Sequence, residues 1–477
     1  MRTRSSVSVL FVAAFALAGL RTRPALHAQT PDIRARIDAY VDALSSGSPD
    51  RFEAMAQDNF TPELLDRTAA QRRSMVMRVH DDFGELTIAN ERMTTATHAE
   101  LGMQSHKNSL PLSIAIDFET AAPHRISSVA VRAGGPAGGG RGGPPLPAPP
   151  IDPKMPDDEL SVALGGYLGG LAAAHDFTGV VLAARDGQTI FENAYGVANP
   201  EGHAPMSADL RFNVASIGKA FTKTAVAQLI AAGKLKESDT IGTLLPDYPN
   251  PDARPATVAQ LLRFQAGIAD FFGERFSSEP KDRFQSNHDY YAFVAPQPLT
   301  FRPGEKTEYC NGCYIVLGEI IAKVAGVPYE RYIHEHVFAP AGMKTAGFLA
   351  FDDPQVAMGY TRKAPDQPWI SAINMHGHHG SAAGGAYATA RDLLAFDNAI
   401  RTRVLLDARM TAWFFDNPAD QSRARATDRY GIAGGAPGAN ASLESNGAWT
   451  IVSLGNLDPP NAVRVGEVLA SALYSRH

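Results

Sequence analysis

The residues best suited to do chemistry in this sequence are a serine and a lysine three positions apart, Ser216 and Lys219. They open an apolar-patterned stretch, 216–232, that predicts a helix. Residues i and i+3 share one face of a helix, so the lysine amine can reach the serine hydroxyl. A serine hydroxyl is a weak nucleophile until a neighbouring base takes its proton, and a lysine withdrawn from water can help. The spacing therefore predicts a nucleophile and a general base.

The same S-x-x-K spacing recurs at Ser278 to Lys281, where the sequence context differs. That match contains Pro280 and leads into polar sequence. The match at Ser216 instead follows an apolar stretch and starts a long helix, which places the helix N-terminus beside the hydroxyl. We therefore assign the chemistry to Ser216.

Tyr309 and Asn311 form a second candidate pair, between a Pro-Gly turn and a predicted helix. A tyrosine beside a lysine can relay protons, and an asparagine amide can hold a substrate carbonyl or amide. Y-x-N spacing also occurs at Tyr248 to Asn250, which lacks these surroundings. We take Tyr309 as catalytic and Asn311 as substrate-binding.

Strands at both ends of the C-terminal part, with helices between them, must position these residues. Asp186-Gly187 between two apolar runs predicts a hairpin, 179–195. The other predicted elements are helices at 256–264, 312–324, 329–337 and 390–400, strands near 439–454, and a helix at 462–474. This order predicts an α+β fold with an antiparallel sheet flanked by helices.

A glycine- and proline-rich segment divides the chain into parts. Residues 134–155 lack apolar periodicity and predict a linker. It separates a small domain, 29–133, from a catalytic domain, 156–477. Residues 1–28 resemble a signal peptide, with Arg2 and Arg4 before an apolar run, which predicts a periplasmic or secreted protein.

The small domain is predicted to be α+β. Ile33, Ile37 and Leu44 mark a first helix, and Phe60 with the leucines after it marks a second. Alternating patterns that begin near 86, 112 and 126 predict strands. Helices followed by a strand meander resemble the NTF2-like cone fold. A ligand-holding cone is one interpretation, and a spacer or docking module is the interpretation we prefer.

Five blocks carry a more specific resemblance: SIGKAFTKTAVAQLI, FRPGEKTEYCNGCYIVLGEIIAKVAG, GMKTAGF, AAGGAYATARDLLAF and AGGAPG. They resemble successive blocks of the class C β-lactamase-related serine hydrolases, which are also penicillin-binding-protein-like. The resemblance implies a β-lactamase/transpeptidase-like fold and an acyl-enzyme on Ser216, with no cofactor. It also implies that Lys219 and Tyr309 share the acid and base work, and that Asn311 binds substrate.

The third motif of that family is a Lys or His, a variable residue and a glycine on a strand that lines the cleft. Alignment on AGGAPG places Ile432, Ala433 and Gly434 there, so the cationic side chain is missing. Lys344-Thr345 does not supply it, because Ala346 follows where glycine is needed. Backbone N–H groups near Gly435 can still help form an oxyanion hole.

The missing cation favours an esterase or amidase acting on less acidic substrates. A D,D-peptidase, a D-aminopeptidase and a β-lactamase remain alternatives, and so does a binding or regulatory pseudoenzyme. A second departure is the run Phe264 to Gly267, where relatives often carry His-Thr-Ser-Gly.

Two further clusters have simpler interpretations. Cys310 and Cys313 form C-x-x-C without a βαβ pattern, so we favour buried thiols or a strained disulfide over a redox motif. His376, His378 and His379 lack an acidic or cysteine partner at ligand spacing, so we assign no metal.

Composition limits the partners. The net charge is −6, and the chain has no long basic run, which argues against nucleic acid. We predict a small ester, amide or peptide as substrate and no stable membrane anchor. The oligomeric state is left open.

Overall fold

The computed structural model describes residues 31–65, 72–73, 76, 79–80, 83–105, 112–133, 146–199, 204–362, 368–416, 430–474 and 476. The chain divides into two compact units between Gly135 and Pro136, within the predicted linker. The predicted signal peptide and residues 134–145 of that linker lie outside the described residues.

The first unit packs helices on a four-stranded antiparallel sheet of order β1-β2-β3-β4. Its elements are α1 Pro31–Ser45, α2 Pro49–Asn59, α3 Pro62–Leu65, β1 Leu86–Thr95, β2 His98–Ser105, β3 Leu112–Phe118 and β4 Ile126–Ala133. Helices followed by strands agree with the sequence pattern. The predicted second helix corresponds to α3, which contains Leu64 and Leu65. The sequence pattern missed α2, which Ser48 caps and Pro49 begins.

The second unit is built on a five-stranded antiparallel sheet of order β13-β14-β15-β5-β6. These strands are β5 Gly179–Arg185, β6 Gln188–Tyr195, β13 Tyr430–Ala436, β14 Ala439–Ser445 and β15 Trp449–Gly455. Asp186 and Gly187 both have positive φ, as the predicted hairpin between β5 and β6 requires. Pairing of β15 with β5 joins the first and last strands of the unit, so the predicted α+β arrangement is confirmed.

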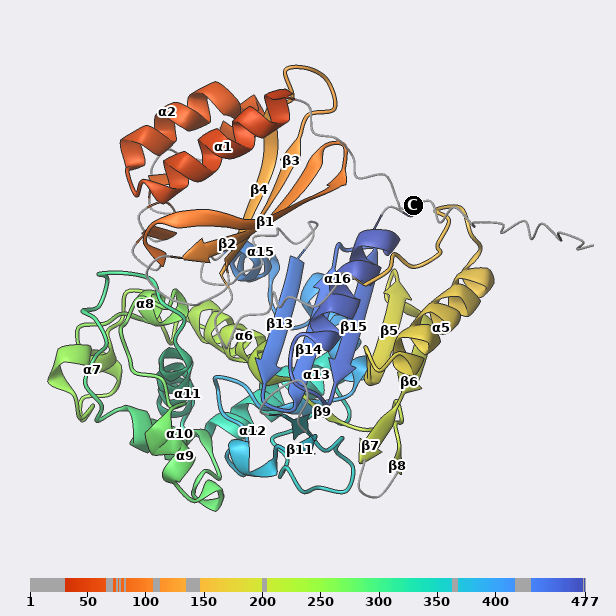
Figure 1. The fold of residues 1–477 in the computed structure, drawn as a ribbon. Coiled ribbons are helices and arrows are strands. Elements are labelled where there is room, and N and C mark those ends of the chain that lie inside the picture. Colours follow the sequence, from red (N-terminus) through yellow and green to blue (C-terminus); the bar gives the residue numbers. More distant parts are fainter. Residues whose placement is uncertain are drawn as a thin grey trace, which may run out of the picture. The chain divides into compact units, whose positions relative to one another are not determined.

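Two helices cover one face of this sheet, α5 Asp157–Ala173 and α16 Asn461–Leu473 (Figure 1). Leu164 and Leu168 of α5 share a buried cluster with Ile451 of β15 and Leu469 of α16. Helix α5 was not predicted, because its four glycines are poor helix formers, although its buried residues Leu160, Leu164, Leu168 and Leu171 recur at helical spacing.

The remaining helices share a second buried cluster with the opposite face of the sheet. They are α6 Gly218–Ala231, α7 Ile241–Leu244, α8 Val258–Leu262, α9 Glu274–Ser278, α10 Asn287–Val294, α11 Asn311–Ala325, α12 Tyr329–Ile333, α13 Ala339–Ala341, α14 Ala390–Arg401 and α15 Ala408–Asp416. Of these, α14 contacts β5 and β15 directly. Phe221 of α6 packs edge-on against Phe338 and Phe396, with ring centroids 5.1 and 5.0 Å apart. This packing makes α6 the central helix, and it anchors the segment that starts with Ser216.

Short pieces complete the unit. The two-residue and three-residue strands are β7 Val197–Asn199, β8 Ala204–Pro205, β9 Phe212–Asn213, β10 Tyr360–Thr361, β11 Ile370–Ser371 and β12 Tyr387–Ala388. A π-helical turn, 334–338, joins α12 to α13. No single helix among the described residues is long and apolar enough to cross a membrane, although 311–325 and 329–341, bent by 78°, meet that test together.

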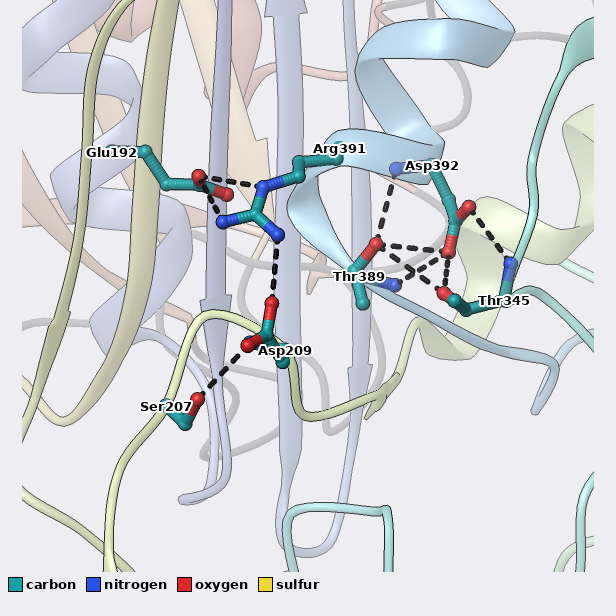
Figure 2. Close-up of polar contacts among 7 residues, drawn as sticks. All are labelled: Glu192, Ser207, Asp209, Thr345, Thr389, Arg391 and Asp392. Atoms are coloured by element: carbon teal, nitrogen blue, oxygen red, sulfur yellow. Dashed lines mark hydrogen bonds and ion pairs between the residues drawn. The ribbon is translucent and has the colours of Figure 1, made fainter.

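The start of α14 explains why Thr345 does not belong to the third motif. Thr389 and Asp392 form a reciprocal capping box, and Asp392 also accepts from Thr345 (Figure 2). Beside it, Arg391 pairs with Glu192 and Asp209, with nitrogen–oxygen distances of 2.7 Å in each pair. Thr345 therefore holds a turn against a helix N-terminus.

Candidate active site

Ser216 lies at a sharp turn between β9 and α6. The α-helix begins only at Gly218, so the predicted helix start is corrected to a 3-10 turn, Ala215–Ile217. Ala215 has φ of +46°, a conformation that residues other than glycine rarely adopt. The side chain of Asn213 accepts from the Ala215 N–H at 2.8 Å. Such local strain is often stored where a side chain must be aimed at substrate.

The structure brings Ser216, Lys219 and Tyr309 together. Ser216 Oγ lies 2.6 Å from the Tyr309 hydroxyl and 3.2 Å from Lys219 Nζ. Tyr309 directly precedes Cys310, which caps α11. The fold thus brings Tyr309 to Ser216, which lies 93 residues earlier in the sequence. One hydroxyl therefore has two proton-exchanging partners within hydrogen-bonding distance.

Lys219 is buried, with 7% of its surface exposed, and its amine has three acceptors. Besides Ser216 Oγ, these are Asn311 Oδ1 at 2.7 Å and the Ala383 carbonyl at 2.6 Å. Three acceptors match the three protons of an ammonium group. Nζ also lies 4.8 Å from the centroid of the Tyr309 ring, within cation–π range. These contacts hold the lysine amine beside both hydroxyls.

Asp270 is a site residue that sequence reasoning missed. Its carboxylate accepts from Asn311 Nδ2 at 2.8 Å, which turns the Asn311 Oδ1 toward Lys219. Asn311 lines the cleft, but both ends of its amide also bind other protein groups. No spacing rule connects Asp270 to Asn311, although Asp270 follows closely the unusual run that ends at Gly267.

The four predicted third-motif residues, 432–435, have different surroundings. Ile432 is 8% exposed and packs in the main hydrophobic core, and Ala433 is exposed. At Gly434, an added Cβ would lie 2.3 Å from the Val214 carbonyl, so only glycine allows this close approach. Of the four predicted residues, Gly435 lines the cleft, and the adjacent Ala436 lines it as well.

The N–H of Gly435 points out of the sheet. Ala436 pairs with Ala439 across the two-residue loop Pro437-Gly438, and hydrogen-bonded pairs alternate along an antiparallel ladder, so Gly434 and Ala441 form a hydrogen-bonded pair. The Asn440 side chain also donates from Nδ2 to the Gly434 carbonyl at 3.1 Å. The Gly434 carbonyl therefore points toward β14. Because the carbonyl and the N–H of one trans peptide point in opposite directions, the Gly435 N–H points to the free edge of β13. The adjacent Gly434 lies against the turn that carries Ser216.

The cleft is open to solvent, and the space between its walls and at its mouth is about 660 Å³. Its described lining comprises Asn213, Ala215, Ser216, Phe271, Phe272, Tyr290, Tyr309, Asn311, His376 to Ser381, Ala383 to Gly385, Tyr387, Gly435 and Ala436. Within this lining, no residue is an Asp, Glu, Lys or Arg. Aromatic rings, small residues and histidines make up most of the wall.

The histidine segment contributes imidazole rings to the cleft. Nε2 of His376 lies 2.6 Å from the Pro437 carbonyl, which can only accept, so Nε2 carries the proton. Burial lowers the pKa of His376, and burial together with His378 lowers the pKa of His379. Across the part of the chain that the structure describes, no three His, Cys, Asp or Glu side chains are arranged to hold a metal ion.

Cys310 and Cys313 form a disulfide, one of the two states we favoured, with their Cα atoms 5.3 Å apart. The bridge closes the first turn of α11, between Tyr309 and the rest of the helix. It lies inside the buried core and does not line the cleft. A structural role in holding Tyr309 and Asn311 follows.

The profile of the Beta-lactamase family matches residues 166–453, which include the whole cleft. The chain belongs to the beta-lactamase family. The resemblance seen in the five sequence blocks is therefore confirmed for this domain, as is the α+β fold class.

The relatives of this beta-lactamase-family chain include proteins named as penicillin-binding proteins and as D-aminopeptidases. Bacillus subtilis PbpX, which carries a provisional penicillin-binding-protein name, is 32% identical over 229 residues, 47% of this chain and 55% of that protein. A D-aminopeptidase of Brucella anthropi is 27% identical over 228 residues, 46% of this chain and 42% of that protein. The matches thus span about half of these curated relatives.

A solved structure extends the likeness to the whole fold of the second unit. A penicillin-binding protein from Bacillus halodurans superimposes with a TM-score of 0.57 and 25% identity. The match covers 64% of this beta-lactamase-family chain and 99% of that one.

Proposed function

We propose that this protein is a serine hydrolase that forms an acyl-enzyme on Ser216, with esters or amides of low charge as substrates. The observation that carries the proposal is the position of one serine hydroxyl, 2.6 Å from Tyr309 and 3.2 Å from Lys219. Membership of the beta-lactamase family supports it.

The geometry suggests a division of labour in the first step. The Lys219 amine is also held by Asn311 and the Ala383 carbonyl, which leaves the Tyr309 oxygen as the immediate acceptor of the Ser216 proton. As Ser216 Oγ bonds to the acyl carbon, its proton passes to the Tyr309 oxygen while the Tyr309 hydroxyl gives its own proton to the leaving oxygen or nitrogen, and the bond between that atom and the acyl carbon breaks. Water then attacks the acyl-enzyme and gives a proton back through Tyr309, which releases the acid and restores the serine hydroxyl.

Backbone donors stabilise the charge that develops on the acyl oxygen. The outward N–H of Gly435 follows Gly434, which lies against the serine turn, and the N–H of Ser216 provides the second donor in this proposal. Fixed donors of this kind contribute about 2.7–4 kcal/mol each in related hydrolysis reactions.

The substrate preference follows from the missing third-motif cation. Ile432 is buried in the core, and no Lys or Arg lines the described cleft. A substrate carboxylate would lose its water without gaining a partner. Ester and amide hydrolysis is therefore preferred over reactions on anionic β-lactams or D,D-peptides, and the D-aminopeptidase relative makes a peptide-like amide the second candidate.

Burst kinetics test the proposal directly. Purified protein is mixed with p-nitrophenyl acetate or a chromogenic cephalosporin, with Ser216→Ala and Tyr309→Phe as variants. We expect ester turnover with a stoichiometric burst, loss of both in Ser216→Ala, and a fall of about 100-fold or more in Tyr309→Phe. Rapid cephalosporin hydrolysis would contradict the substrate preference, whereas absence of any acyl adduct on Ser216 by mass spectrometry would favour a pseudoenzyme.

We also propose that the protein is exported, from the charged and apolar pattern of residues 1–28. Expression in a Gram-negative host followed by fractionation tests this. Recovery of a shortened chain in the periplasm or medium supports export, and a full-length chain confined to the cytoplasm contradicts it.

A further inference from the structure

A cluster of aromatic rings lies beside the catalytic groups. Rings from Phe271 to Phe293 contact one another, with centroids between 4.1 and 6.4 Å apart; the members are Phe271, Phe272, Phe276, Phe284, Tyr290 and Phe293. Most are buried and stabilise the fold. Three of them, Phe271, Phe272 and Tyr290, also line the cleft that contains Ser216.

Phe272 is the exposed member of this cluster. It is 44% exposed, while its ring lies 4.1 Å from that of the buried Phe271 and 5.7 Å from that of Phe276. A single exposed phenylalanine is common on protein surfaces. This one, however, is backed by packed rings and faces the cleft, so an apolar surface is already formed when a ligand arrives.

Hydrogen bonds fix this wall relative to the nucleophile. Phe271 directly follows Asp270, whose carboxylate binds Asn311 at 2.8 Å. Asn311 binds Lys219 at 2.7 Å, and Lys219 binds Ser216 at 3.2 Å. The aromatic pair is therefore connected to the acylated oxygen through three short contacts.

Tyr290 presents its ring and not its hydroxyl. The hydroxyl donates to the His379 carbonyl at 2.9 Å. The His376–Ser381 segment packs directly on it, since a Cβ at Gly377 would lie 2.1 Å from that oxygen. With its polar atom satisfied, the rest of the side chain adds apolar surface to the wall.

Charge also restricts what this wall accepts. Among the described residues that line the cleft, none carries a permanent charge. An acyl group with a carboxylate or an ammonium would leave water without a compensating partner there. A flat, uncharged ring would instead gain contact with Phe271 and Phe272.

We propose that Phe271, Phe272 and Tyr290 form an aryl subsite that selects uncharged aromatic acyl groups for transfer to Ser216. This inference rests on the proposed hydrolase function and names its substrate class. Arylacetyl esters and amides are the chemistry that fits a ring-lined wall next to a nucleophilic hydroxyl.

Three esters with one leaving group test the subsite: p-nitrophenyl acetate, p-nitrophenyl phenylacetate and mono-p-nitrophenyl succinate. After correction for their reactivity with hydroxide, we expect kcat/KM to be at least tenfold higher for the phenylacetate than for the acetate, and lowest for the succinate. Phe272→Ala should reduce the phenylacetate-to-acetate ratio about tenfold, because part of the ring burial is lost. Phe272→Tyr keeps the ring and should keep most of the ratio.

Trp369→Ala is the matched control, because Trp369 is also a partly exposed aromatic residue, at 37%, and does not line the cleft. It should leave the ratio unchanged. An unchanged ratio in Phe272→Ala, or a succinate preference in the wild type, would overturn the subsite.

A binding experiment separates this inference from the hydrolase proposal. Ser216→Ala is titrated with phenylacetamide or acetamide. Saturation-transfer NMR reports contact through the ring protons of phenylacetamide and the methyl protons of acetamide. Binding of phenylacetamide that weakens when Phe272→Ala is added supports the subsite, even if no ester is turned over. Equal signals for both amides refute the subsite, even in an active hydrolase.

Discussion

At the scale of single residues, the site is a chain of polar contacts and not a serine with one base. Asp270 orients the Asn311 amide, Asn311 binds Lys219, and Lys219 contacts Ser216. An asparagine amide can point either of its ends at a neighbour, so a fixed carboxylate is needed to select the oxygen. Asp270 is accordingly a positioning residue, because it acts on the reaction through Asn311.

Replacing Asp270 tests this role. Asp270→Ala removes the acceptor of Asn311 Nδ2, so we expect kcat for p-nitrophenyl acetate to fall about tenfold with little change in KM. Asp270→Asn still offers an amide oxygen and should recover most of the activity. Steady-state kinetics of both variants provide the measurement, and Asp282→Ala, a nearby exposed carboxylate, is the control. Equal losses in Asp270→Ala and Asp270→Asn would contradict a positioning role through hydrogen bonding.

At the scale of elements, the site depends on how closely β13 approaches the turn before α6. Gly434 faces this turn, and an added Cβ would lie 2.3 Å from the Val214 carbonyl and 3.1 Å from the Ser216 nitrogen. Glycine at this position therefore decides the distance between the edge strand and the nucleophile. Three of the four glycines of α5, Gly166, Gly169 and Gly170, face open space and have no such role.

Gly434→Ala should displace β13 and with it the outward N–H of Gly435. We expect kcat/KM for p-nitrophenyl acetate to fall at least tenfold, since small misplacements of a catalytic donor are costly. In the control Gly166→Ala, nothing lies within 4 Å of the new methyl group. That variant should keep full activity and raise the free energy of unfolding by about 0.5–1 kcal/mol. Wild-type activity in Gly434→Ala would show that β13 does not supply a donor.

The histidine segment 376–379 gives the second unit a pH-dependent stability. The pKa values of His376 and His379 are lowered in the fold, mainly by burial, although Asp458 opposes the shift at His376. As the pH falls, His376 and His379 become protonated near pH 6.5 in the unfolded chain, but only at a lower pH in the folded chain. The free energy of unfolding should therefore fall as the pH falls from 7 toward 5, and level off once the folded protein is protonated too.

Chemical denaturation at several pH values measures this effect. His376→Gln keeps a donor for the Pro437 carbonyl and removes the titration, so its stability should fall less steeply between pH 7 and 5. A profile identical in slope to the wild type would exclude His376 as a contributor.

At the scale of the whole second unit, a buried carboxylate ties α14 to the sheet. Asp397 is fully buried and pairs with Arg401 at 3.0 Å. It also accepts from Tyr430 of β13, from Ser445 of β14 at 2.9 Å and from Thr450 of β15 at 2.7 Å. One side chain thus connects a helix to three adjacent strands, one of which carries Gly434 and Gly435.

Asp397→Ala should destabilise the unit by about 3–5 kcal/mol, because it leaves buried Arg401 and three hydroxyls without this acceptor. Urea denaturation followed by tryptophan fluorescence measures the loss. The comparison variant is Asp209→Ala, which removes a surface partner of Arg391 and should cost less than about 1 kcal/mol. Similar values for the two variants would contradict the anchoring role of Asp397.

The sequence by itself determined the parts of this protein that depend on local geometry. Ser216 and Lys219 are one turn apart, so helix geometry alone predicts that they meet, as they do at 3.2 Å. The hairpin at Asp186-Gly187 follows from turn chemistry, and the central helices follow from apolar periodicity. Five family-like blocks were sufficient to predict the family and the fold class.

Only the tertiary structure decided which distant groups complete the site. Asp270, the Ala383 carbonyl and the aromatic wall reach the cleft through packing between elements, and no local pattern encodes such contacts. The same holds for the third-motif strand. Ile432 of β13 packs in the core, whereas Gly435 of the same strand lines the cleft. Spacing along the chain fixes contacts within a helix or hairpin, whereas contacts between elements depend on how all their buried faces pack at once.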